Sequence, residues 1–206
     1  MHDRPCPHDL LWGMSPAQVP ADAPAWARQV LEAGQPVVVR RAMVASGQIA
    51  VGIRGASRDQ RYATLMSMDS VCRRVRPEEL IEGVHAGDLP PLRALVQLMP
   101  AMDELGLDWG ITGSVGYQLA TGIPAAHANS DLDLLVRAPR AITRPSAREL
   151  LRLLDAAPCR VDLQLETPAG AIALREWAGD SDRVLLKCPT GARLVADPWA
   201  RAEQVA

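Results

Sequence analysis

The chain has 206 residues, of which 48% are hydrophobic and 22% charged, and this allows one large domain or two small ones. Its 22 basic and 24 acidic residues give a formal net charge of -2, which disfavours a protein that binds nucleic acid through a broad basic surface. Aromatic residues make up only 3% and Phe is absent, so a surface that stacks single-stranded bases is also disfavoured.

The cysteines and the N-terminal sequence indicate a reducing compartment. Cys6, Cys72, Cys159 and Cys188 are widely scattered and form no C-x-x-C pair, which disfavours a structural zinc site and a disulfide framework. The N-terminus lacks the pattern of a signal sequence, and no apolar run is long enough to cross a bilayer. We therefore expect a cytoplasmic protein that does not associate with membranes.

Residues 1–88 are expected to form a small β-rich N-terminal domain. The segment PADAPAWARQVLEAGQP predicts a short helix, with Asp22 as its N-cap and Gly34 as its C-terminal stop. Apolar and alternating runs then predict strands at 36–42, 48–55 and 60–68. Pro77 is expected to open one helical turn before the domain ends.

Residues 89–206 are expected to form a second domain around a mixed α/β sheet, which places the chain in the α+β class. Its first helix, within 88–107, should be kinked or ended by Pro100. The helical period there is carried by Leu92, Leu95, Val96 and Met99. The pattern then predicts strands at 107–112, 131–138 and 159–167, helices from Ser114, over 143–157 and in ALREWAG, and a closing hairpin.

Three acidic residues lie on two of these predicted strands. Successive strand side chains point to opposite faces, so Asp131 and Asp133 should share one face while the leucine between them faces the other. The same alternation in CRVDLQLET sets Asp162 apart from its apolar neighbours. If the two strands pair, three carboxylates meet at one place.

Such a group of carboxylates needs a positive partner, because burying like charges side by side is costly. Oxygen ligands of this kind suit Mg²⁺, which keeps positions for water or substrate phosphate. A D-x-D pair alone is also compatible with inert acids that flank a strand. The third acid favours the metal site, with Asp131, Asp133 and Asp162 as catalytic and metal-binding residues.

Gly113 and Ser114 lie between a predicted strand and a predicted helix. A glycine permits a tight turn, and a helix that opens with serine aims backbone N–H groups and a hydroxyl at an anion. Ser114 is equally compatible with an ordinary N-cap, and the Walker pattern G-x-x-x-x-G-K-[ST] is absent. We treat both residues as candidate substrate-binding residues.

Other charged residues give weaker signals. Arg54, Arg58 and Arg61 cluster in GIRGASRDQR, where they could bind phosphate or form a solvated loop. Lys187 lies on a predicted strand and could face the phosphate site. The histidines show no paired spacing typical of metal ligands.

The order Gly113-Ser114, helix, Asp131-x-Asp133 strand, helix, Asp162 strand resembles the nucleotidyltransferase superfamily. That resemblance implies metal-assisted attack on the α-phosphate of a triphosphate, with pyrophosphate as the leaving group. It also implies a nucleotidyltransferase-like fold for the second domain, and Mg²⁺ as the cofactor.

A closer resemblance covers nearly the whole chain. The segments VVVRRA, IAVGIRGASRDQR, GSVGYQLATG, SDLDLLV, VDLQLETPAGAIALREWA and DPW are similar to the malonate decarboxylase holo-acyl-carrier-protein synthase family, which are phosphoribosyl-dephospho-CoA transferases. This resemblance implies transfer of the 2′-(5″-phosphoribosyl)-3′-dephospho-CoA group from its triphosphoribosyl precursor to a serine of the decarboxylase's acyl-carrier subunit. The partners so implied are this donor and the apo-carrier. Apart from the resemblance, their charge makes Arg54 and Lys187 further candidate substrate-binding residues.

Two other functions fit part of the pattern. Another Mg²⁺-dependent nucleotidyltransferase, for example one that transfers AMP, would carry the same Gly-Ser and D-x-D residues. A non-catalytic module that binds an acyl carrier or a nucleotide could share the fold, although it would have no reason to keep three costly carboxylates.

Overall fold

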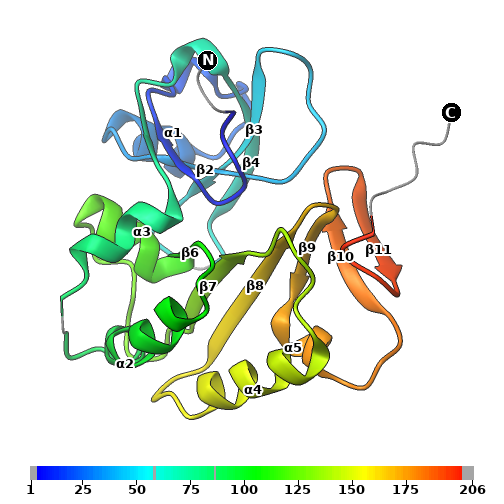
Figure 1. Cartoon of the computed structure of the whole chain (residues 1–206). Helices are drawn as coiled ribbons and strands as arrows, with labels where there is room; N and C mark the ends of the chain where they lie inside the picture. The colour runs from blue at the N-terminus through cyan, green and yellow to red at the C-terminus, as the bar shows by residue number, and fades with distance from the viewer. Residues whose placement is uncertain (1–3, 58, 86, 201–206) are drawn as a thin grey trace, which may run out of the picture. The chain divides into compact units, whose positions relative to one another are not determined.

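The computed structural model describes residues 4–57, 59–85 and 87–200, and the chain divides into two compact units, Met1–Arg76 and Pro77–Ala206 (Figure 1). The division lies before the expected boundary after residue 88, because the 3-10 helix η3 (Pro77–Gly83) packs on strand β6 and helix α3 of the second unit. Within the described residues, no helix has both the length and the apolar character that a membrane span requires.

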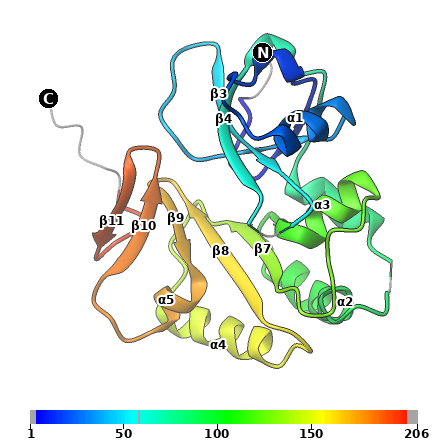
Figure 2. The same cartoon turned by 180° about the vertical axis from the view of Figure 1, so that it is seen from behind.

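The first unit is built on an antiparallel sheet whose strand order is β4-β3-β2-β1-β5. Figure 2 shows β3 and β4 of this sheet side by side. Its strands are β1 (Leu10–Trp12), β2 (Val37–Val39), β3 (Gln48–Arg54), β4 (Arg61–Ser67) and β5 (Arg73–Val75). Its helices are η1 (Pro16–Gln18), α1 (Ala25–Glu32) and η2 (Met68–Ser70). Alternate residues of β3, among them Val51 and Ile53, pack in one apolar core with Ala27 and Leu31 of α1.

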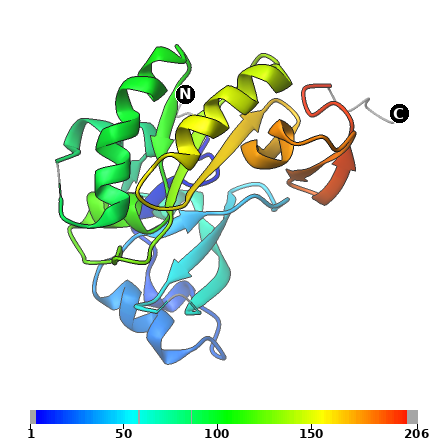
Figure 3. The ribbon, with the colours of Figure 1, turned by 90° about the horizontal axis from the view of Figure 1, so that it is seen from below.

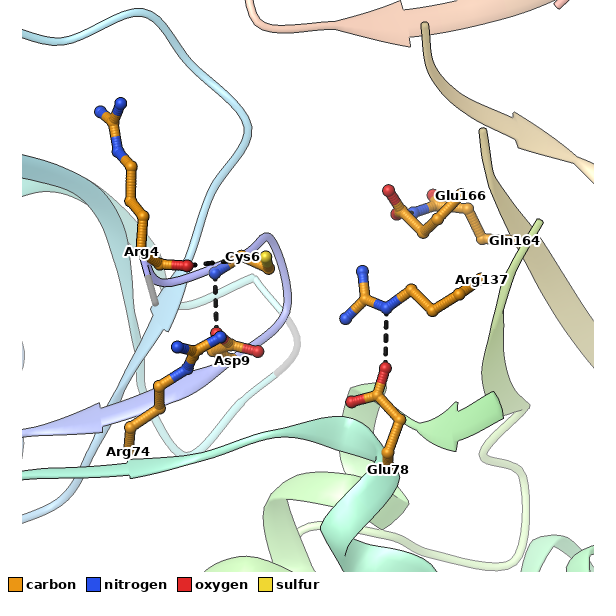
Figure 4. Close-up of polar contacts among 8 residues, drawn as sticks. All are labelled: Arg4, Cys6, Asp9, Arg74, Glu78, Arg137, Gln164 and Glu166. Carbon is orange, nitrogen blue, oxygen red and sulfur yellow. Dashed lines mark hydrogen bonds and ion pairs between the residues drawn. The ribbon is translucent and has the colours of Figure 1, made fainter. Parts of the chain in front are cut away.

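A buried ion pair lies at the start of β1. Asp9 is fully buried, and its Oδ2 accepts hydrogen bonds from Arg74 Nε and from the backbone N–H of Cys6, both at 2.7 Å (Figure 4). Charge-assisted bonds of this kind offset part of the cost of burying a carboxylate. The pair joins the segment before β1 to β5, which neighbours β1 in the sheet.

Three strands of the first unit were predicted and two were not. The predicted strands at 36–42, 48–55 and 60–68 correspond to β2, β3 and β4. β1 and β5 have three residues each, too few to show alternation, and yet β1 lies between β2 and β5. Asp22 as a helix cap was wrong, since α1 begins at Ala25 with Pro24 in the N-cap position.

The second unit contains a mixed sheet with the strand order β11-β10-β9-β8-β7-β6, which confirms the α+β class. Its strands are β6 (Trp109–Ile111), β7 (Leu132–Arg137), β8 (Val161–Thr167), β9 (Gly170–Ala173), β10 (Val184–Cys188) and β11 (Gly191–Val195). β7 and β8 run parallel, and the other neighbouring pairs are antiparallel. β10 and β11 form the predicted closing hairpin.

The helices of this unit are α2 (Pro90–Glu104), α3 (Gly113–Thr121), α4 (Arg144–Asp155) and α5 (Leu174–Ala178). α4 connects the two parallel strands, and α5 lies beside α4 and β8 (Figure 3). The predicted start of α4 is confirmed, because Thr143 Oγ1 accepts a hydrogen bond from the backbone N–H of Ser146. β9 was not predicted, since its four residues run directly into α5.

Two parts of what was expected of α2 were wrong, an end of the helix at Pro100 and a place for Val96 in the buried stripe. The helix continues through Pro100, which is exposed and lies within the helix rather than at its end. Its buried stripe is Pro91, Ala94, Leu95, Leu98 and Met102, whereas Val96 of the predicted stripe is 41% exposed. Because buried residues flank Pro100 on both sides, packing compensates for the hydrogen bond that proline cannot donate.

The C-terminal segment of the unit forms hydrogen bonds at the C-terminal ends of the parallel strands β7 and β8. Trp199 Nε1 donates a hydrogen bond of 2.8 Å to the carbonyl of Ala138, just after β7. Thr167 Oγ1, at the end of β8, donates one of 2.7 Å to the carbonyl of Pro198. The Trp199 ring also meets the ring of Trp177 edge to face, with 5.2 Å between centroids.

At β6, a glycine lets η3 lie directly on the sheet. A Cβ at Gly110 would come within 2.5 Å of the backbone N of Glu78 and 2.7 Å of Pro77 Cβ. We expect Gly110→Ala to lower the free energy of unfolding by about 1–3 kcal/mol through overpacking. Chemical denaturation followed by circular dichroism measures this change.

Gly83→Ala is the matched control, because a Cβ at Gly83 in the same 3-10 helix meets nothing within 4 Å. This variant should stay within about 0.5 kcal/mol of the wild type. Equal losses in both variants would show that η3 does not rest on Gly110.

Candidate active site

The register of the parallel strands brings two of the three predicted acids together. Asp133 of β7 is the register partner of Asp162 of β8, and Leu132 and Leu134 pair with Val161 and Leu163. The leucines and valines are buried, while both acids are half-buried. Side chains alternate along a strand, so Asp133 and Asp162 extend from the same face of the sheet.

Asp133 also lies against the first residue of α3. A Cβ at Gly113 would overlap the Asp133 carboxylate, and Gly113 has a φ of 62°, a left-handed backbone that other residues rarely adopt. The backbone N–H of Thr112 donates a hydrogen bond of 2.9 Å to the Asp133 carbonyl. The positive end of the α3 dipole therefore lies beside this carboxylate.

Ser114 is the second residue of α3, and it is half-buried. The helix begins one residue earlier than predicted, with Thr112 as its N-cap and no side-chain capping bond. Ser114 is therefore not an N-cap. The N–H groups of a helix's first turn have no partner within the helix, and they face outward from its N-terminus.

Asp131 precedes β7 by one residue and is half-buried. Burial raises the pKa of the Cys159 thiol, and the negative charge of Asp131 acts in the same direction. Asp131 therefore lies close to Cys159, the residue two positions before β8. This places Asp131 at the same edge of the sheet as Asp133 and Asp162.

Asp162 has a cationic partner that the sequence reasoning missed. Arg160 Nε donates a hydrogen bond of 3.1 Å to Asp162 Oδ1, and Arg160 Nη2 forms an ion pair with the same oxygen at 3.0 Å. The backbone carbonyl of Arg160 accepts a hydrogen bond of 2.9 Å from Leu132, between the two acids of β7. The alternation that picked out Asp162 also places Arg160, two residues earlier, on the same face, and this signal was available in the sequence.

The acids provide oxygen donors of the kind that a divalent ion uses. Mg²⁺ commonly takes one or two protein carboxylates and completes its shell with water and substrate phosphate, and Asp133 with Asp162 fits that donor set. Within the described ranges, no group of three or more His, Cys, Asp or Glu side chains is arranged to hold a metal ion. The three-carboxylate metal site therefore stays a prediction.

Lys187 lies on the same sheet face, far from these acids. It is exposed on β10 and pairs in register with Ala171 of β9. Ala171 pairs with Glu166 of β8, and Glu166 pairs with Arg137 of β7. Partners in register share a face. Lys187 is therefore separated from β7 by two strands and lies level with Arg137, near the other end of β7.

Arg137 and its neighbours form a polar cluster at that end. Arg137 Nε donates to Glu78 Oε1 at 2.7 Å, and Gln164 Nε2 donates to Glu166 Oε1 at 2.6 Å. Figure 4 shows the side chains of Arg137, Gln164 and Glu166 extending to the same side of the sheet. Glu78 belongs to η3, so this ion pair, like Gly110, fixes η3 on the sheet.

The predicted arginine cluster belongs to the first unit. Arg54 ends β3 and pairs in register with Arg61, which begins β4. Arg61 Nη1 donates to the carbonyls of Ser57 and Gln60, so this guanidinium supports the loop between the strands. Arg58 lies outside the described residues.

Comparisons with known proteins cover both units. Residues 79–198 match the family model described as the phosphoribosyl-dephospho-CoA transferase MdcG C-terminal domain, and residues 6–77 match the MdcG N-terminal domain. No solved structure matches the chain.

Curated relatives match over nearly the full length. A phosphoribosyl-dephospho-CoA transferase from Pseudomonas putida is 60% identical over 195 residues, which are 95% of this chain and 95% of the relative. One from Pseudomonas fluorescens is 58% identical over 200 residues, which are 97% of this chain and 96% of the relative. One from Azotobacter vinelandii is 57% identical over 200 residues, which are 95% of this chain and 94% of the relative.

The junction of β7 and α3 can be tested through stability. Gly113→Ala places a methyl group against the Asp133 carboxylate, and it also forces an L-residue into a left-handed backbone. We expect losses of about 1–2 kcal/mol from the backbone and about 1–3 kcal/mol from overpacking. Urea denaturation measures the sum.

Gly122→Ala separates the two contributions, because Gly122 has a φ of 72° and a Cβ there meets nothing within 4 Å. It should lose the backbone contribution alone. Adding Asp133→Ala to Gly113→Ala should recover part of the overpacking loss, because it removes the carboxylate but keeps the Cβ, which would lie 2.8 Å from a Cβ at position 113. If both glycine variants lose the same stability, Asp133 does not lie against Gly113.

Proposed function

Because the chain belongs to the phosphoribosyl-dephospho-CoA transferase family, we propose that it modifies the acyl-carrier subunit of malonate decarboxylase. The group transferred is 2′-(5″-phosphoribosyl)-3′-dephospho-CoA, taken from its triphosphoribosyl precursor. The acceptor is a serine hydroxyl of the apo-carrier. The observation that supports this proposal best is the Asp133–Asp162 pair beside the first turn of α3.

The proposed reaction is an in-line displacement at phosphorus. The serine oxygen bonds to the α-phosphorus of the donor while the bond between that phosphorus and the bridging oxygen of the β-phosphate breaks. The products are a phosphodiester on the carrier and pyrophosphate. The hydroxyl proton goes to Asp162 in one form of the proposal. In the other, Asp162 would complete a second metal site and the proton would pass to water.

Asp131, Asp133 and Asp162 would hold Mg²⁺ at the edge of the sheet where β7 and β8 begin. When bound, the ion would neutralise charge on the triphosphate oxygens and stabilise the entering and leaving oxygens. Asp133 is suited to this role because its carboxylate is fixed against Gly113, so little freedom is lost when it becomes a ligand.

The start of α3 would bind the departing pyrophosphate. Backbone N–H groups of a first helical turn bind phosphate well, and the helix dipole adds to the attraction. Ser114 offers a hydroxyl at the same place. In this proposal, Gly113 is needed because it lets the turn approach both Asp133 and the anion.

Two further cations are proposed as substrate-binding residues. Lys187 is exposed on the same sheet face as the acids, at the level of Arg137, and suits an anionic part of the dephospho-CoA. Arg54, at the end of β3, is the candidate from the first unit. Neither residue is proposed to take part in bond making.

The proposal is tested by incubating the protein with Mg²⁺, the triphosphoribosyl donor and the apo-carrier, and then measuring the mass of the carrier. We expect the carrier to gain one phosphoribosyl-dephospho-CoA group and pyrophosphate to appear in equal amount. Transfer of AMP from ATP instead would indicate a different nucleotidyltransferase. An unmodified carrier that binds tightly would indicate a non-catalytic module.

Asp131→Asn and Asp133→Asn should each lower the transfer rate at least about a hundredfold, because loss of metal-bound charge stabilisation costs several kcal/mol. Asp180→Asn is the control, since the Asp180 side chain is 98% exposed and pairs with Arg148 outside the site. Unfolding curves should show that all three variants remain folded. Full activity of Asp133→Asn would remove this carboxylate from the mechanism.

A further inference from the structure

Arg160 brings a positive charge to the candidate metal site. Its Nε and Nη2 both point at one oxygen of Asp162, Oδ1, at 3.1 and 3.0 Å, so Arg160 does not engage the second oxygen. The arrangement differs from the two-oxygen fork by which arginine holds a carboxylate most firmly. Asp162 keeps one face of its carboxylate for another ligand.

The ion pair is accessible to solvent and therefore easily exchanged. The Arg160 side chain is 64% exposed and the Asp162 side chain 41%. Ion pairs at such exposure contribute little free energy, because water screens the charges and the long side chain gains freedom when it leaves. The register Asp133–Asp162 nevertheless holds this exchangeable pair beside the other acids of the site.

A second cation near Asp162 is tied down. Arg175 Nη2 bonds to Asp155 Oδ1 at 2.6 Å, and this bond together with the charges of Asp155 and Asp162 raises the pKa of the Arg175 guanidinium. Arg175 therefore attracts the Asp162 carboxylate through its charge while it stays bonded to Asp155. Of the two arginines, Arg160 is the one whose side chain contacts Asp162 directly.

We propose that Arg160 is an exchanging counter-cation that pairs with Asp162 before metal and donor bind and moves to the β- and γ-phosphates when they do. This inference rests on the function proposed above. A divalent ion on Asp162 would repel a guanidinium a few ångströms away, whereas the triphosphate would attract it. Arginine's planar fork then suits two phosphate oxygens at once.

The exchange predicts effects of opposite sign in one variant. Arg160→Gln removes the competing charge, so Mn²⁺ alone, used as a paramagnetic probe, should bind severalfold more tightly. Inorganic pyrophosphate, added at saturating Mn²⁺, should bind about tenfold more weakly, as expected for one lost charge-assisted contact. Electron paramagnetic resonance gives the first affinity and calorimetry the second.

Arg140→Gln is the matched control, since Arg140 is exposed in the loop after β7, at the opposite end of the strand, and its substitution changes the net charge equally. It should alter neither affinity more than about twofold. Arg160→Lys should regain part of the pyrophosphate affinity, because it restores the charge without the fork.

Unchanged or weaker Mn²⁺ binding by Arg160→Gln would overturn the exchange, and so would unchanged pyrophosphate binding. The two proposals fail separately. If Arg160→Gln shows both affinity changes but the wild-type protein modifies no carrier, the exchange stands and the proposed transfer function is wrong. If the wild-type protein modifies the carrier but Arg160→Gln shows neither affinity change, Arg160 has no part in the site.

Discussion

The parallel pairing of β7 with β8 is the constraint on which the candidate site depends. Helix α4 returns the chain so that both strands begin at the same edge of the sheet, and the register then sets Asp133 beside Asp162. A slip of one residue would turn Asp162 toward the buried leucines and bring an apolar side chain to its place. The apolar half of each strand, fully buried on the opposite face, opposes such a slip.

Much of this arrangement could be predicted from short-range pattern. The alternation of VDLQLET appears unchanged in the burial of β8, and the capped, leucine-rich α4 was equally clear. These features depend on neighbours within a few residues, which is the information that a single sequence holds. The same alternation extends to Arg160, two residues before Asp162, and so places a positive charge on the face that carries the acids.

What could not be predicted depends on partners far away in the sequence. β1 is defined by its ladders to β2 and β5 rather than by its three residues, and β9 by its ladders to β8 and β10. The pairing of Arg137 with Glu78 joins residues that are 59 positions apart. For α2, several apolar stripes were possible, and only packing on the sheet decided which one is buried.

The bonds from Trp199 and Pro198 have a consequence for the order of events during synthesis. They reach back to Ala138 and Thr167, so the two strands that begin at the acids are held at their other ends by residues that follow them by 61 and 31 positions in the chain. A nascent chain can assemble the first unit while it is still on the ribosome, since domains form from the N-terminus onward. The bonds that hold the far ends of β7 and β8 can form only after residue 199 has cleared the exit tunnel.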